Sequence, residues 1–137
     1  MKNDAGKSVL LASLNSLDMD AINRGCAASD LGTLHAKEAL PDLEKFATAD
    51  PKTAVREGAL RGLAELGDLS SVKALVQALD DPVTSNRIYA AGILEKIMFG
   101  QTYPLDVVES HEGQIIASWK SWLAGNGSPP NYSRYLH

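Results

Sequence analysis

The chain has 137 residues, of which 45% are hydrophobic and 22% are charged, and its formal net charge is −4. This composition is typical of one globular domain and excludes a disordered chain. The acidic balance disfavours nucleic acid as a partner, because its phosphates are usually met by a basic face. No apolar run approaches the roughly 18 residues that a membrane-spanning helix needs, and the run at residues 9–12 is too short for a secretory signal. We therefore expect a cytoplasmic protein with no membrane contact.

The sequence contains no recognisable pattern of a disulfide, a metal site or a catalytic site. Its single cysteine, Cys26, cannot form an intramolecular disulfide. The three histidines are scattered and, together with Cys26, match none of the spacings typical of a metal site. No pair of carboxylates is placed for acid–base catalysis. We therefore predict no metal, no cofactor and no catalytic residue, and we expect Cys26 to be a small buried thiol on a helix face.

The first predicted element is one helix within residues 1–17. Its Leu11 and Leu14 have the spacing of Leu43 and Phe46, which belong to the second helix of the repeat that follows. The segment thus has the pattern of the second half of a repeat whose first half is missing. Such a helix would cap an array of repeats, whose ends need covering.

A motif of four residues then occurs three times, at spacings of 32 and 31 residues. Its copies are Asp18-Arg24-Ala27-Leu31, Asp50-Arg56-Ala59-Leu63 and Asp81-Arg87-Ala90-Leu94. Self-similarity at a fixed period of this length is the signature of a repeat array. The motif predicts repeats over residues 18–49, 50–80 and 81–100 of a single domain that spans residues 1–137.

Each repeat is expected to contain a helix, a tight turn and a second helix. In the central copy, Asp50 would cap the first helix and Pro51 would occupy its first position. Gly67 suits the left-handed conformation that ends a helix, and Ser70 or Ser71 would cap the second helix. Apolar residues recur at helical spacing on both helices: Val55, Ala59, Leu63 and Leu66 on the first, and Val72, Leu75 and Leu79 on the second.

The pattern breaks after residue 100, and residues 101–137 are expected to form a C-terminal capping helix and a tail. The helix is predicted over about residues 112–124 and carries Trp119 and Trp122 on its apolar side. We favour a lid over the core for this pair, with a ligand-facing aromatic pair as the alternative. In the tail, Tyr132 and Tyr135 are placed to contact either a partner or the chain itself.

The first and central copies resemble HEAT repeats, in particular the short bacterial form also known from phycobilisome lyases. The central copy matches the pattern D-P-x-x-x-V-R-x-x-A-x-x-x-L-x-x-L-G-D at every specified position from Asp50 to Asp68, whereas the third copy has Asn86 in place of Val. The resemblance covers about residues 18–100. It implies an all-α fold, an α-α superhelix of antiparallel helix pairs.

The repeated acidic and basic positions form one candidate set: Asp18, Arg24, Asp50, Arg56, Asp81 and Arg87. In the interpretation that we favour, each guanidinium binds acceptors at the turn of its own or the next repeat and ties the array together. In the alternative, the three arginines line up as a ladder that binds anions.

In HEAT-like arrays the second helices line the concave face. The resemblance therefore predicts a set of groove residues: Asp42, Glu44, Lys45, Lys73 and Gln77. Their mixed charge and the lack of an aromatic residue suit a protein or peptide partner. The leading interpretation is a non-catalytic protein–protein interaction module or scaffold. The alternatives are a chromophore-lyase-like enzyme or fragment, a HEAT-like nucleic-acid-binding protein, and a structural subunit that self-assembles into a homo-oligomer.

Overall fold

The computed structural model describes residues 2–130 and 132–135, with side chains described for residues 5–130, Tyr132 and Tyr135. These residues form eight α-helices and three short 3-10 turns, and they contain no strand. The α-helices are α1 Lys2–Asn15, α2 Ala21–Thr33, α3 Leu40–Ala49, α4 Thr53–Leu66, α5 Val72–Ala78, α6 Thr84–Phe99, α7 Leu105–Ser110 and α8 Glu112–Leu123. The 3-10 turns are η1 Lys37–Ala39, η2 Leu69–Ser71 and η3 Tyr132–Tyr135.

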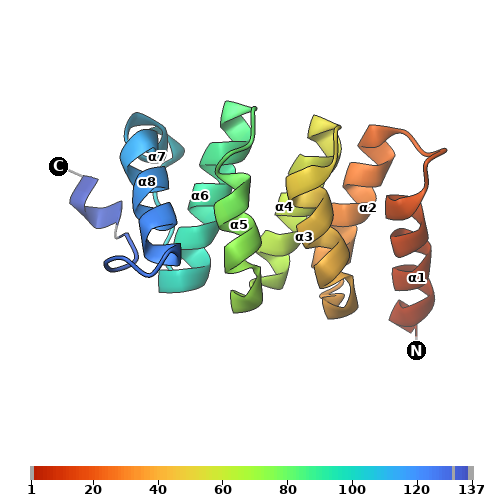
Figure 1. The fold of residues 1–137 in the computed structure, drawn as a ribbon. Helices are drawn as coiled ribbons and strands as arrows, with labels where there is room; N and C mark the ends of the chain where they lie inside the picture. The colour runs from red at the N-terminus through yellow and green to blue at the C-terminus, as the bar shows by residue number, and fades with distance from the viewer. Residues whose placement is uncertain (1, 131, 136–137) are drawn as a thin grey trace.

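The helices form a single row of pairs in two layers. Figure 1 shows α3, α5 and α8 side by side in front of α2, α4 and α6, with α1 at one end of the row and α7 and α8 near the other. Neighbours within each layer are in contact, and α1, α3 and α5 each pack against the first helix of the following repeat, which is α2, α4 and α6 respectively. This arrangement confirms the expected all-α fold of antiparallel helix pairs.

The turns inside the repeats use left-handed residues at equivalent positions. Gly67 ends α4 with a φ of 58°, as the sequence predicted, and His35 has a φ of 52° at the equivalent position of the first repeat. Ser71 stands at the N-cap position of α5, one of the two serines predicted there, but its side chain makes no capping hydrogen bond. The side chain of Asp68 instead caps the preceding η2, where it accepts from the Ser70 backbone N–H at 2.9 Å. Short 3-10 turns, rather than direct caps, lead into the second helices α3 and α5.

The turns between repeats depend on one aspartate each. Asp50 Oδ1 accepts from the backbone N–H of Lys52 at 2.9 Å, and Asp81 Oδ1 accepts from that of Val83 at 2.8 Å. Each carboxylate therefore closes a turn on its own backbone before the helix begins. The expected start of α4 is wrong: Asp50 is not its N-cap and Pro51 is not its first residue, because both lie in this turn and α4 begins at Thr53 with Lys52 at the N-cap.

The second oxygen of each of these carboxylates is bound by an arginine of the preceding repeat. Arg24 Nη2 lies 2.7 Å from Asp50 Oδ2, and Arg56 Nε lies 2.8 Å from Asp81 Oδ2. Arg87 makes the third such ion pair with Glu112, the first residue of α8. The ladder thus links each repeat to the next one and links the last repeat to the C-terminal helix.

The same guanidinium groups also donate to backbone carbonyls behind them. Arg24 Nε donates to the Leu14 carbonyl at 2.9 Å, and Arg56 Nη1 donates to the Asp50 carbonyl at 3.0 Å. Within one repeat, therefore, the aspartate offers the arginine its carbonyl and not its carboxylate. The inclusion of Asp18 in the ladder is wrong, because this exposed residue lies in the turn before α2, where Asp20 is the N-cap.

Glycines allow α2 and α4 to approach each other unusually closely. A Cβ atom on Gly58 would lie 2.1 Å from the Gly25 carbonyl oxygen, and one on Gly62 would lie 2.5 Å from the Ala28 carbonyl oxygen. In the third repeat, Tyr89 and Ile93 stand at the positions of these two α4 glycines. Their bulk accounts for the looser contact between α4 and α6.

The C-terminal helices close the last repeat. Trp119 of α8 is fully buried, which confirms the predicted lid, and its ring meets that of Trp122 edge to face at 5.5 Å. The tail folds back on the chain: Tyr132 is also fully buried and its hydroxyl bonds Trp119 and the Ala91 carbonyl. The short α7 was not predicted: the sequence indicated only one helix after residue 100, over about residues 112–124, and α7 precedes it at Leu105–Ser110.

One buried acid lies beneath this tail. The side chain of Glu95 on α6 is 1% exposed, and neither of its carboxyl oxygens has a hydrogen-bond partner among the described residues. Burial raises the pKa of the Glu95 carboxyl to about 7, although the nearby Tyr132 backbone N–H opposes the rise. Glu95 is therefore an ionisable group whose charge no described side chain compensates.

The ladder gives a test of stability by substitution. Arg56 is 7% exposed and links two repeats, whereas Arg61 is exposed, pairs with Glu57 on the same helix and lies 5.9 Å from the centre of the Tyr89 ring. We expect Arg56→Ala to lower the free energy of unfolding by about 3 kcal/mol or more, because it leaves Asp81 buried without its cation. Arg61→Ala should cost about 0.5 kcal/mol. Equal shifts in thermal melting for the two variants would show that the ladder does not hold the array together.

Glu95 gives a test of stability by pH. Because its pKa is raised in the folded state, its stabilising contribution is complete below pH 4.5, the ordinary pKa, and is lost as the pH rises to about 7. The loss amounts to about 3 kcal/mol. Glu95→Gln should therefore match the wild type below pH 4.5 and unfold at a higher denaturant concentration than the wild type at pH 8. Parallel stability profiles for the two proteins would contradict a buried neutral acid.

Candidate functional site

Four of the five predicted groove residues line one hollow. It lies between the second helices α3 and α5 and has a volume of about 410 Å³. Its lining comprises Pro41, Glu44, Lys45, Thr48, Ser70, Lys73, Ala74 and Gln77. The structure thus brings Glu44, Lys45, Lys73 and Gln77 together from two helices that are about thirty residues apart in sequence.

Asp42, the fifth predicted residue, does not line this hollow. It is half-buried on the side of α3 that faces α1, where its Oδ2 accepts from Asn15 Nδ2 at 3.4 Å. The prediction placed it in the groove because it belongs to the second helix. Its position, one residue before the buried Leu43, turns it instead toward the N-terminal end.

The hollow continues along the helices toward the ladder. A smaller hollow of about 170 Å³ shares Thr48 and Gln77 with the first and is also lined by Asp50, Arg56 and Asp81. The two hollows form one groove, which we call the α3/α5 groove. It has lysines along its middle and carboxylates at one end.

The polar side chains in the middle of the α3/α5 groove are uncommitted. In the part of the chain that the structure describes, the side chains of Glu44, Lys73 and Gln77 make no hydrogen bond or ion pair. Lys45 Nζ lies 5.1 Å from the centre of the Phe46 ring and pairs with no carboxylate. These groups keep their full capacity to bind a ligand of either charge.

Two of the ladder arginines, Arg56 and Arg87, already use all three nitrogen atoms of the guanidinium group. The Nε, Nη1 and Nη2 atoms of Arg56 all donate to protein acceptors, and the residue is 7% exposed. Arg87 uses the same three atoms on Glu112, the Asp81 carbonyl and Thr84. This geometry favours the structural interpretation of the ladder over an anion site.

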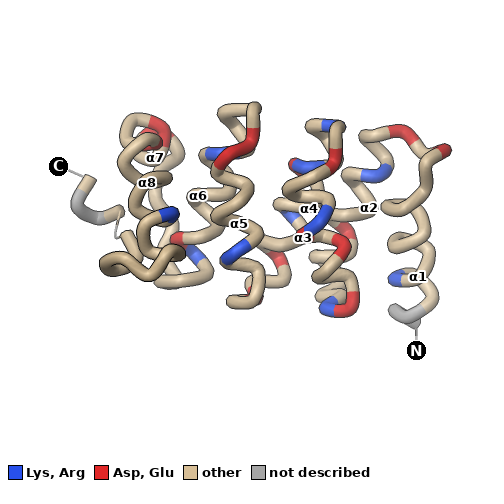
Figure 2. The backbone as a smooth tube through the Cα atoms, in the orientation of Figure 1, with Lys and Arg blue, Asp and Glu red and all other residues tan. Residues whose placement is uncertain are grey.

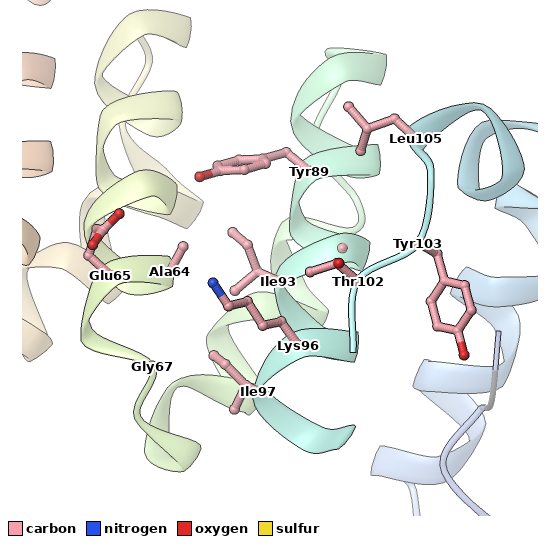
Figure 3. A pocket seen from close by; sticks show the side chains of 11 residues that line it. Ala64, Glu65, Gly67, Tyr89, Ile93, Lys96, Ile97, Thr102, Tyr103 and Leu105 are labelled. Carbon is pink, nitrogen blue, oxygen red and sulfur yellow. The ribbon is translucent and has the colours of Figure 1, made fainter. Parts of the chain in front are cut away.

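A second cleft, which sequence reasoning missed, lies on the other layer. It has a volume of about 570 Å³ and lies between α4, α6 and the segment before α7. Figure 3 shows the Tyr89 hydroxyl and the Lys96 amine both directed from α6 toward α4, with Ile93 beside them, while Tyr103 points away toward the C-terminal helices. Burial raises the pKa of Tyr89 above its ordinary value. The sequence did contain a signal for this cleft: Tyr89 and Ile93 stand where the central repeat has Gly58 and Gly62.

Cys26 is exposed, so the expectation of a buried thiol is wrong. It lies on the outer side of α2, at the position of Gly58 and Tyr89 in the other repeats, and lines a shallow hollow with Gly25 and Arg61. Among the described residues, no group of three His, Cys, Asp or Glu side chains is placed to hold a metal ion. No described helix is both long enough and apolar enough to cross a membrane.

Charge is distributed evenly over the array. Figure 2 shows basic and acidic residues interspersed along the whole row of helices, without a continuous stripe of one sign over the described residues. Some of these charges pair across helices, as Lys120 does with Asp80 near the end of the α3/α5 groove. Such a surface distinguishes ligands by the positions of their charges and not by net charge.

Comparison with known proteins agrees with this architecture. A family model described as HEAT repeats matches residues 8–94, well over half of the chain. Searches of curated proteins and of solved structures returned no match. HEAT repeats commonly serve as scaffolds for protein interactions. The matched segment runs from α1 into α6 and includes every predicted repeat motif, so the chain belongs to the HEAT-repeat family.

Proposed function

We propose that the chain is a non-catalytic interaction module that binds a segment of another protein in the α3/α5 groove. The observation that carries the proposal is the set of uncommitted side chains along this groove: Glu44, Lys45, Lys73 and Gln77. The ladder, by contrast, bonds its buried charges to each other. Polar groups left free on the inner face of a repeat array are suited to a partner.

The chemistry of the groove indicates the kind of segment. Lys45 and Lys73 are suited to a partner segment that carries at least one acidic side chain. Glu44 favours a basic or amide group next to that acidic side chain. Pro41 and Ala74 provide small apolar surfaces and no aromatic ring lines the groove, so no deep anchor pocket is present within the described residues. Binding should therefore be modest in affinity and sensitive to salt.

Self-association is a second candidate, because the N-terminal end of the row exposes apolar side chains. Leu17, Ile22 and Val9 are 97%, 70% and 65% exposed, although α1 covers the end of the array. A second copy could cover them. Sedimentation velocity over a series of concentrations tests this: the wild type should associate and Leu17→Lys/Ile22→Lys should remain monomeric. A wild type that stays monomeric throughout would contradict self-assembly.

The groove proposal is tested with peptides selected on the protein itself. Peptides that bind the wild type are isolated from a random library, and their affinities for two double variants are measured. Lys45→Glu/Lys73→Glu should weaken binding about tenfold, or ~1.4 kcal/mol, because it reverses both basic contacts. Lys52→Glu/Lys96→Glu makes the same change in net charge away from the groove and should leave binding unchanged.

Two results would count against the groove. Selected peptides that bind Lys45→Glu/Lys73→Glu as tightly as the wild type would place the binding surface elsewhere. Loss of binding in Lys52→Glu/Lys96→Glu would point instead to the cleft that contains Lys96. Circular dichroism of both variants should show the wild-type helix content, since all four lysines are exposed.

A further inference from the structure

The C-terminal tail inserts one tyrosine into the end of the array. Tyr132 is fully buried, and its hydroxyl accepts from Trp119 Nε1 at 2.5 Å and donates to the Ala91 carbonyl at 2.7 Å. The Tyr103 ring lies 5.8 Å away, centre to centre. We call this site the tyrosine socket and define it by Ala91, Glu95, Tyr103 and Trp119.

The socket is selective for a phenol. It presents one donor, the indole N–H of Trp119, and one acceptor, the Ala91 carbonyl, to a single oxygen atom. Only a hydroxyl group can bond both, because it donates and accepts at once. A phenylalanine ring would fill the same volume but would leave the buried indole N–H without a partner, which disfavours it strongly.

The covalent connection to the tyrosine is exposed and turns sharply. α8 ends at Leu123, and residues 124–128 are all exposed, with Gly125 at a φ of 91° and Gly127 at a φ of 81°. Two backbone hydrogen bonds hold the start of this turn to the end of α8, from the Gly125 N–H to the Trp122 carbonyl and from the Asn126 N–H to the Ser121 carbonyl, both at 2.9 Å. Residues 124–128 bury no side chain, so the tail is joined to the array by this turn and by the contacts of the segment that follows it.

Glu95 makes occupation of the socket costly when it is ionised. The Tyr132 backbone N–H is the donor nearest to its carboxyl group, and the buried phenol lies close enough to feel its charge. No basic side chain compensates it among the described residues: Arg87 on the same helix binds Glu112, Lys120 on α8 binds Asp80, and His111 stacks on Tyr135. An empty socket would admit water to the carboxylate, so ionisation favours the empty state.

We propose that the tyrosine socket is a peptide-binding site for tyrosine-bearing segments, and that the chain's own Tyr132 occupies it as a displaceable plug. The partner is recognised by its phenol hydroxyl between Trp119 and Ala91. Occupation is tighter at acidic pH, where Glu95 is neutral. This site lies at the C-terminal end of the row and is distinct from the α3/α5 groove.

The test uses the full chain with its plug removed. Tyr132→Ala vacates the socket, and a fluorescently labelled synthetic peptide of residues 128–137 is titrated in while its anisotropy is measured. The peptide should bind saturably to Tyr132→Ala and at least tenfold more weakly to the wild type, whose own tail competes. The same peptide with phenylalanine in place of Tyr132 should bind Tyr132→Ala at least tenfold more weakly, because it leaves Trp119 unpaired.

The pH dependence separates a binding site from an ordinary core contact. The affinity of the tyrosine peptide for Tyr132→Ala should fall as the pH rises from 5 to 8, and the additional substitution Glu95→Gln should abolish the fall. If Tyr132→Ala does not fold, Tyr132→Phe is used, because this variant keeps the ring and loses both hydrogen bonds. The tyrosine peptide should then bind Tyr132→Phe more tightly than it binds the wild type. Equal affinities of the tyrosine and phenylalanine peptides, or no binding to a folded variant, would overturn the proposal.

Discussion

The architecture depends on one repeated interaction, an arginine that bonds two repeats at once. Arg56 donates to the carbonyl of Asp50 behind it and to the carboxylate of Asp81 ahead of it, and Asp81 spends its other oxygen on the turn that starts α6. A guanidinium that is 7% exposed is tolerated only when its donors are all bonded. The spacing of consecutive repeats is therefore fixed by hydrogen-bond geometry as well as by the apolar core.

The two layers of helices pack differently because the residues at two equivalent positions change from one repeat to the next. At Gly58 and Gly62 the backbones of α2 and α4 touch, so no side chain separates the first two repeats on that layer. The equivalent Tyr89 and Ile93 keep α6 away from α4 and open the cleft that contains Lys96. On the opposite layer, α3 and α5 leave the continuous groove of Lys45 and Lys73. A regular period in sequence thus produces repeats that are not equivalent in packing.

The sequence predicted those features that recur with the period and missed those that depend on a single contact. The helix pairs, the left-handed Gly67 and the lid residue Trp119 were predicted correctly. The prediction that Asp18 belongs to the ladder was wrong because no arginine of a preceding repeat is present to bind it, and Asp20 is the N-cap of α2. The prediction of a buried Cys26 was wrong because a position on a helix does not by itself show which side of the helix a neighbour covers. The groove residues were placed by resemblance, and only Asp42 lies outside the groove.

The C-terminal end shows why a repeat array needs contacts of another kind where it stops. Within the described residues, Arg87 binds Glu112 at the start of α8, where the earlier arginines bind the aspartate of the next repeat. Beside α8, Tyr132 fills the space over α6 from a segment with no repeat pattern. A cap that served stability alone would place an apolar side chain at Glu95, because an unpaired buried carboxyl destabilises the fold at neutral pH. Retaining an acid beneath a tail joined by an exposed glycine turn is consistent with an end that opens.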